Sequence, residues 1–270
     1  MSHPELDRAA GPAAPVIGAL TRLGFAAKGL VTILVGVLAL RFALRKGGGI
    51  IDQEGAVEWV VRHPFGRWML GALAVGLAGY AVWMYVAAVL DPERKGKGLQ
   101  GIAERLGFLT TGIGYTLLAY TAFTLLLGRR DVGGHDVKQV VAMVLTPHLG
   151  RVVVGLAGVI VMVAGGFQLR LAITAGFRDQ LRAGLSRLER AAVDVSGRFG
   201  YVTLGVLSLM IGWSLVQVAV QYDPSKVDGW QDALWLLAGM GSGRMLLAAA
   251  ATGLICYGLF FVLQVRDRRL

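Results

Sequence analysis

Six long apolar runs alternate with short polar stretches along the chain, at about residues 24–45, 67–90, 107–127, 151–173, 200–221 and 244–265. A helix needs roughly 20 mostly apolar residues to cross a bilayer, and each run reaches that length. The stretches between the runs are too short to fold as a separate domain with its own core. The pattern therefore predicts an all-α integral membrane protein with six transmembrane helices.

The entry of every odd-numbered run carries the same motif, R-[LF]-G-[FY]-x-x-x-G, in copies that begin at Arg22, Arg105 and Arg198. A Gly-Arg pair follows each copy at a matched distance and opens the even-numbered run. The arginines of these pairs are Arg67, Arg151 and Arg244. Two anchors at matched separation in three copies indicate an internal repeat of span, loop and span.

The repeat divides the chain into an N-terminal tail (1–20), repeat 1 (21–95), repeat 2 (104–175), a basic linker (176–196) and repeat 3 (197–270). Each repeat holds two spans, so all three enter the membrane in the same orientation. Parallel repeats of this kind are related by an axis along the membrane normal. We therefore expect three parallel helix hairpins in a pseudo-threefold bundle.

The loop inside each repeat holds a short segment that mixes apolar and polar residues and ends near Pro or Gly. These segments predict brief amphipathic helices in the interface, with Trp59, Trp230 and Trp235 at headgroup level. A simple ordered turn is the alternative. In the linker 176–196, apolar residues at helical spacing among arginines predict a basic amphipathic helix on an anionic leaflet.

Glycine is frequent, with 39 copies in the chain. Small residues let helices approach closely in lipid, where they favour association. We therefore expect the glycines of the second and fourth runs to lie at helix contacts; these are Gly71, Gly76, Gly79, Gly155, Gly158, Gly165 and Gly166.

The chain has a net charge of +10, although only 16% of its residues are charged. Lys and Arg lie mainly at span ends and in loops, so the expected partner is anionic lipid, with a membrane protein as a further candidate. Nucleic acid is not an expected partner. The distribution of Lys and Arg on the two sides of the spans favours both termini in the cytoplasm.

The repeated motif, together with Pro-Phe-Gly-Arg-Trp at 64–68, resembles a bacterial membrane family catalogued as domain of unknown function 1206. The resemblance covers about residues 20–268 and implies a multi-span protein of the bacterial inner membrane. It implies no activity, cofactor or catalytic residue. The second and third copies replace Pro-Phe-Gly-Arg-Trp with "PHLGRV" and "GMGSGR", so the three copies do not share a role for Pro64, Phe65 or Trp68.

Motifs for chemistry are not found in the sequence. The four histidines lack the spacing of a metal site, and Cys256 is the only cysteine. The loop "GKGLQG" at 96–101 fits G-x-G-x-x-G, but it joins two spans rather than a strand and a helix. We therefore expect no catalytic residue, no cofactor, no metal site and no enzyme activity.

Six arginines are candidate contacts to headgroups or anions. They form the two repeat sets Arg22, Arg105, Arg198 and Arg67, Arg151, Arg244. The simpler interpretation is that each arginine anchors one helix end to lipid phosphates. The alternative is two charged rings around the pseudo-threefold axis that attract anions or headgroups.

Three polar residues inside the runs are candidate intramembrane sites, because polar side chains are costly in hydrocarbon: Lys28, Arg41 and Gln217. Lys28 lies about 9 Å along a helix from the motif arginine, a distance that a long side chain can largely cover. We favour snorkelling to the headgroups over a role in translocation, for Lys28 and for Arg41. Asp91 and Glu93 are candidate partners of Lys28.

The favoured function is a structural membrane component that interacts with lipids or with other membrane proteins. The alternative is a transporter or channel for a small solute or ion with a pseudo-threefold pathway, and an intramembrane enzyme is the least favoured. A polar cavity reached by Lys28, Arg41 or Gln217 would favour transport. A centre packed with glycine, with those side chains facing headgroups, would favour the first interpretation.

Overall fold

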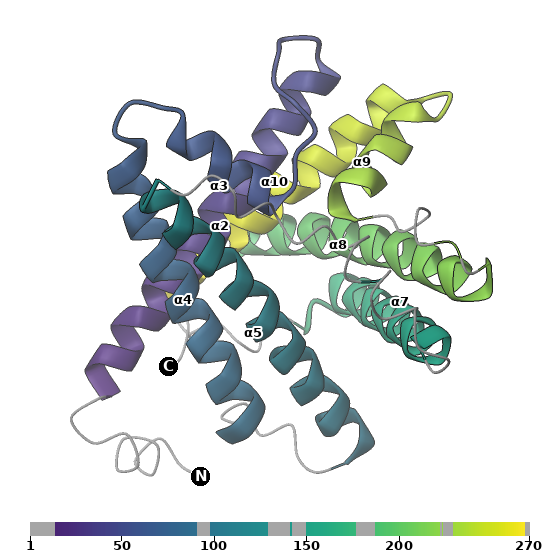
Figure 1. Ribbon diagram of the computed structural model, residues 1–270, viewed down its shortest axis with the longest axis horizontal. Coiled ribbons are helices and arrows are strands. Elements are labelled where there is room, and N and C mark those ends of the chain that lie inside the picture. The colour runs from purple at the N-terminus through teal and green to yellow at the C-terminus, as the bar shows by residue number, and fades with distance from the viewer. Residues whose placement is uncertain are drawn as a thin grey trace. The chain divides into compact units, whose positions relative to one another are not determined.

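The computed structural model describes residues 14–90, 98–128, 141, 150–176, 187–221, 223 and 229–267. Within these residues the ordered elements are α-helices (Figure 1): α2 (Ala14–Ala43), α3 (Gln53–Val61), α4 (Gly66–Leu90), α5 (Leu99–Leu126), α7 (Gly150–Thr174), α8 (Arg187–Gln221), α9 (Trp230–Gly239) and α10 (Gly243–Asp267).

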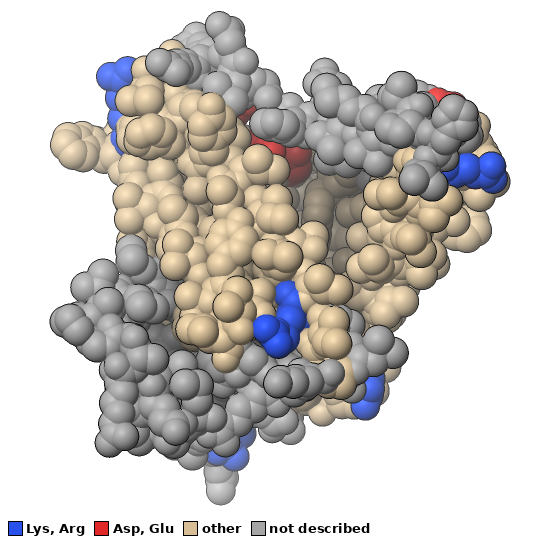
Figure 2. All heavy atoms as spheres, turned by 60° about the horizontal axis from the view of Figure 1, so that its bottom comes forward, with Lys and Arg blue, Asp and Glu red and all other residues tan. Residues whose placement is uncertain are grey.

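Among the described residues, six helices are long and apolar enough to cross a membrane, which confirms the predicted all-α membrane fold. The apolar spans run over Arg22–Ala43, Gly66–Leu90, Arg105–Leu126, Gly150–Thr174, Arg190–Gln221 and Gly243–Val265. A helix satisfies its backbone hydrogen bonds internally, as hydrocarbon requires. Figure 2 shows a face on which Lys and Arg form small separate groups. Most of the described surface in this view is formed by residues other than Lys, Arg, Asp and Glu.

The short connecting helices agree with the sequence pattern in repeats 1 and 3, where α3 and α9 form. In repeat 2 only Val141 of this segment is described, so the predicted helix there lies outside the described residues. The predicted linker helix also lies outside them as far as residue 186, and from Arg187 the chain belongs to α8. Helix α8 therefore begins well before the predicted span 200–221.

The chain forms two compact units. Unit 1 comprises Met1–Leu30, Val57–Val132 and Phe261–Leu270, and unit 2 comprises Val31–Ala56 and Gly133–Phe260. Helices α2, α3 and α10 therefore contribute residues to both units. The pseudo-threefold arrangement of the repeats stays a prediction.

In unit 1, α2 packs on α4 through two glycines. A Cβ at Gly24 would lie 2.6 Å from the Tyr80 backbone nitrogen, and a Cβ at Gly76 would lie 2.6 Å from the Ala27 Cβ. Helices α4 and α5 also pack together, and the Tyr85 hydroxyl lies 2.9 Å from the Thr116 hydroxyl. The backbones of α2 and α4 thus approach each other closely at glycines, which have no side chain to separate them.

In unit 2, α7 and α8 cross with reciprocal glycine contacts. A Cβ at Gly158 would lie 2.8 Å from the Gly212 carbonyl oxygen, and a Cβ at Gly212 would lie 2.7 Å from the Gly158 carbonyl oxygen. Gly165 and Gly205 repeat this relation at 2.9 Å in both directions. The two levels are separated by seven residues on each helix, which keeps them on one helix face.

The repeat motif has a packing role that repeats 1 and 3 share. Gly24 abuts Tyr80 in repeat 1, and its counterpart Gly200 abuts Tyr257 in repeat 3. Tyr80 and Tyr257 occupy the same repeat position, which Ala164 takes in repeat 2. The motif glycine therefore makes room for the backbone and side chain of a tyrosine on the second span.

The Gly-Arg pair also has a structural reason. In repeat 1, a Cβ at Gly66 would overlap the Val60 carbonyl oxygen at the end of α3. In repeat 3, a Cβ at Gly243 would overlap the Ala238 carbonyl oxygen near the end of α9. Each connecting helix thus ends directly against the first residue of the following span.

The glycine prediction holds for Gly76, Gly155, Gly158 and Gly165 and is wrong for Gly166. A Cβ at Gly166 would meet no atom of the described residues within 4 Å. A Cβ at Gly71 would lie 3.8 Å from the Leu126 Cδ2 atom, an ordinary van der Waals distance, so a close helix contact does not require glycine there. The number of glycines in a run does not show which of them lie on the face that contacts another helix.

Substitution of Gly158 by alanine tests the α7–α8 crossing. The new methyl group would force the two backbones apart, and overpacking of this kind lowers the free energy of unfolding by about 1–3 kcal/mol. Gly166→Ala on the same helix is the control, and it should leave stability unchanged or slightly higher. Unfolding in mixed micelles, followed by far-UV circular dichroism, measures both. Equal stabilities for the two variants would contradict the crossing.

Candidate functional site

Lys28 lies inside unit 1, with only 8% of its surface exposed. Its Nζ donates a hydrogen bond of 2.7 Å to the Tyr80 hydroxyl oxygen. The prediction that Lys28 snorkels to the headgroups is therefore wrong. Its candidate partners Asp91 and Glu93 lie outside the described residues.

Aromatic rings from three helices surround the Lys28 ammonium group. Nζ lies 4.0 Å from the ring centroid of Phe261, 4.6 Å from that of Tyr80 and 5.3 Å from that of Tyr115. A cation within about 6 Å of an aromatic face is attracted by the ring quadrupole, and most strongly where water is excluded. The rings take the place of the solvent that a free ammonium group would bind.

The same repeat position in repeat 3 is apolar. Leu204 replaces Lys28 and is equally buried, with 8% of its surface exposed. Repeat 3 also has aromatic contacts near its motif, because the Tyr201 and Tyr257 rings meet edge to face with centroids 5.5 Å apart. The scaffold thus accepts either a cation or a leucine at this position.

Arg41 and Gln217, the other two candidate intramembrane residues, belong to unit 2. Arg41 is exposed, and its Nη2 donates to the Lys46 carbonyl oxygen at 3.3 Å, just beyond the end of α2. Gln217 is half-buried on α8 within unit 2. Arg41 therefore belongs to a helix end, as its position in the sequence suggests.

The three motif arginines differ in their surroundings. Arg105 donates from Nε to the Ala88 carbonyl oxygen at 2.6 Å and from Nη2 to the Val89 carbonyl oxygen at 3.0 Å. These carbonyls belong to the last turn of α4, where a helix lacks internal partners and attracts cations. Arg105 therefore clamps α5 to the end of α4, whereas Arg22 and Arg198 are exposed.

The second arginine set behaves uniformly. Arg67, Arg151 and Arg244 each occupy the second residue of a span helix, and all three side chains are exposed. In repeat 1 large apolar neighbours are also exposed, since Phe65 exposes 80% of its surface and Trp68 83%. Aromatic rings and arginines in this combination are typical of the membrane–water interface.

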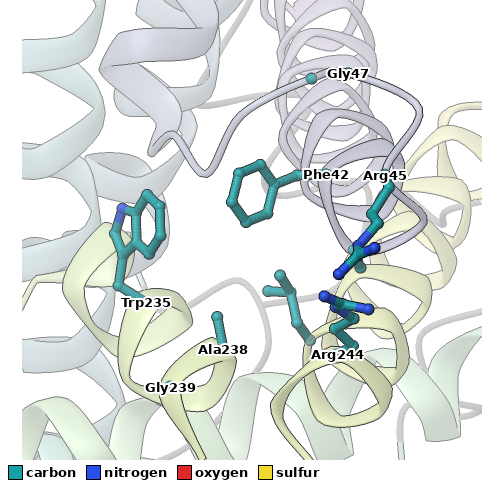
Figure 3. Close-up of a pocket in the computed structure, with 10 residues that line it drawn as sticks. Phe42, Arg45, Gly47, Trp235, Ala238, Gly239 and Arg244 are labelled. Carbon is teal, nitrogen blue, oxygen red and sulfur yellow. The ribbon is translucent and has the colours of Figure 1, made fainter.

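A pocket of about 630 Å³ lies in unit 2, between the end of α2 and the α9–α10 corner. Figure 3 shows the Arg45 and Arg244 guanidinium groups pointing toward one another, with Phe42 and Trp235 along the rest of the wall. The Phe42 and Trp235 rings meet edge to face with centroids 5.3 Å apart. The described lining is completed by Ala43, Ala238, Leu247 and the glycines at 47, 48 and 239.

Arg45 reaches this pocket from a left-handed backbone conformation, with φ of 56°. Its N–H donates to the Phe42 carbonyl oxygen at 3.0 Å, and the Lys46 N–H donates to the Arg41 carbonyl oxygen at 2.9 Å. These two bonds form a Schellman cap, in which glycine is the usual residue at the left-handed position. For a residue with a Cβ, the conformation costs roughly 1–2 kcal/mol.

The sequence motifs predict a role for Arg244, but they predict neither a role for Arg45 and Phe42 nor the pocket itself. One signal was available, because Arg45 aligns in the repeat with Gly128, which ends α5 with φ of 78°. A cap position that holds glycine in one repeat and arginine in another is a candidate for a specific role.

Metal ligation has no candidate among the residues that the structure describes. They contain no group of three or more His, Cys, Asp or Glu side chains that could hold a metal ion.

Comparison with known proteins places the three repeats in one family. A model of the family described as Domain of Unknown Function (DUF1206) matches residues 23–91, 106–175 and 199–268. The chain is 31% identical to the Uncharacterized protein YxxB of Bacillus subtilis (strain 168) over 253 residues, which is 93% of this chain and 90% of that protein. No solved structure matches the chain.

Replacement of Lys28 by leucine tests the aromatic environment of the ammonium group. The leucine should fit, as Leu204 does in repeat 3, but loss of the cation–π contacts should lower the free energy of unfolding by roughly 1–2 kcal/mol. Arg41→Leu on the same helix is the control and should change it by less than about 0.5 kcal/mol. Urea unfolding in mixed micelles measures both. Equally small effects would mean that Lys28 is merely tolerated.

Proposed function

The chain belongs to the family described as Domain of Unknown Function (DUF1206), and from that premise we propose that it is a lipid-interacting structural component of the bacterial inner membrane. Its six apolar helices make it a multi-pass membrane protein. In this proposal both termini lie in the cytoplasm, and anionic lipid headgroups are the principal partner. A membrane-protein partner is a secondary part of the proposal.

One observation carries the proposal: each even-numbered span begins with an exposed arginine. Arg67, Arg151 and Arg244 hold the same place in α4, α7 and α10, so the feature belongs to the repeat and recurs in each copy. A guanidinium group presents a fork of N–H donors that matches phosphate oxygens. At a helix end in the membrane–water interface, the phosphate groups of lipids are the anions closest to such a side chain.

The surroundings of the intramembrane polar residues favour this function over transport. Lys28 packs among aromatic rings, and Arg41 bonds to the backbone beyond its own helix. The pocket of unit 2 is lined by neither of them, nor by Gln217. A transport pathway would need polar side chains that face a passage, as in known selectivity filters.

A triple variant tests the proposal by replacing Arg67, Arg151 and Arg244 with glutamine. The wild-type protein should retain more phosphatidylglycerol than phosphatidylcholine in native mass spectrometry, because only the first lipid carries net negative charge. Loss of charge-assisted contacts to phosphate should reduce the variant's retention to the level of phosphatidylcholine. Equal retention of the two lipids by the wild-type protein would overturn the proposed function.

A further inference from the structure

We propose that the pocket of unit 2 binds one phosphodiester group carried on an apolar body, the headgroup region of an anionic lipid, with Arg45 and Arg244 as its ligands. This inference rests on the proposed function and makes it specific. It assigns a built site to one corner of the protein, beyond the general attraction of helix ends for headgroups.

The charge of the pocket wall is the first argument. Arg45 and Arg244 come from different elements, one after the end of α2 and one in the first turn of α10, and both line the pocket. Their guanidinium groups point toward one another (Figure 3). None of the described lining residues is acidic, so the wall does not neutralise its own two charges. A phosphate between two guanidinium groups would accept several charge-assisted hydrogen bonds.

The backbone at Arg45 is a second, independent argument. The Schellman cap at the end of α2 would be formed more easily by glycine, and repeat 2 does place Gly128 at this position. In repeat 1 the chain instead carries a large charged side chain in a left-handed conformation. Strain of this kind persists at ligand sites because the side chain is needed there.

The apolar part of the wall identifies the body that carries the phosphate. Phe42 exposes 38% of its surface and Trp235 47%, and the two rings stand edge to face beside the arginines. Leu247 and Ala238 extend this apolar wall. A volume of about 630 Å³ lies within the range of small-molecule sites, and an aromatic wall beside a charged corner suits an amphiphile.

The location of the pocket favours a lipid over a free anion. The apolar span of α2 ends at Ala43, and that of α10 begins at Gly243, so both arginines lie at the boundary of the hydrocarbon. Lipid phosphates lie at this level, and aromatic side chains are enriched there. Inorganic phosphate shares the anionic chemistry but would make no use of the aromatic wall.

Two single variants and a matched control test the site. Arg45→Gly should keep the fold, because Gly128 already occupies the same cap position in repeat 2. Arg244→Gln removes the second guanidinium group. Arg170→Gln is the control, because Arg170 is also an exposed arginine of unit 2, near the end of α7, and lies outside the pocket. The purified full-length proteins are titrated with phosphatidylglycerol, phosphatidylcholine or inorganic phosphate, and native mass spectrometry counts retained lipid while a thermal shift reports stabilisation.

We expect Arg45→Gly and Arg244→Gln each to bind phosphatidylglycerol about tenfold more weakly than wild type, the effect of one lost charge-assisted hydrogen bond. The melting temperature of Arg45→Gly without lipid should not fall, and Arg170→Gln should bind as wild type does. Unchanged binding by both pocket variants would overturn this inference, while the proposed function would survive if wild type still prefers phosphatidylglycerol. Equal stabilisation by inorganic phosphate would overturn the lipid as occupant. If Arg45→Gly unfolds, Arg244→Gln alone decides between these outcomes.

Discussion

Close contact between helix backbones is the constraint on which this structure depends. In hydrocarbon, an apolar side chain gains nothing by leaving lipid for another helix, so association relies on van der Waals packing and on a few polar contacts. The contact of Gly158 with Gly212 meets this constraint directly, because each glycine touches the backbone of the other helix. A polar contact accompanies it, since the Ser208 hydroxyl donates to the Gln168 side-chain oxygen at 3.3 Å.

The same constraint explains why the repeat motif is retained in spite of its altered surroundings. In repeats 1 and 3 the motif glycine lets a tyrosine of the second span come close, and the tyrosine also contacts another aromatic ring. The two copies differ in polarity: Tyr80 accepts a hydrogen bond from the buried Lys28, whereas repeat 3 has the buried Leu204 at the position of Lys28. The same glycine–tyrosine contact thus occurs beside a buried charged residue in repeat 1, while repeat 3 has an apolar residue at that position.

The sequence predicts the helices well because hydropathy and length decide which segments can span a bilayer. It predicts the repeat because both anchors are short and recur at matched spacing. It does not predict the surroundings of Lys28, because Tyr80, Tyr115 and Phe261 are distant in sequence and meet only when α4, α5 and α10 pack. Nor does it distinguish Arg105 from the other two motif arginines. The partners of Arg105 are backbone carbonyls of α4, which every residue carries, so no residue type in the sequence marks them.

The corner between α9 and α10 has a mechanical consequence. The end of α9 lies where a side chain of Gly243 would be, so no side chain separates α9 from the start of α10 at this corner. Spans adapt to a thinner or thicker bilayer by changing their tilt. At this joint the carbonyl end of α9 lies directly against the first residue of α10, so α10 has no room to tilt toward α9 unless α9 moves with it.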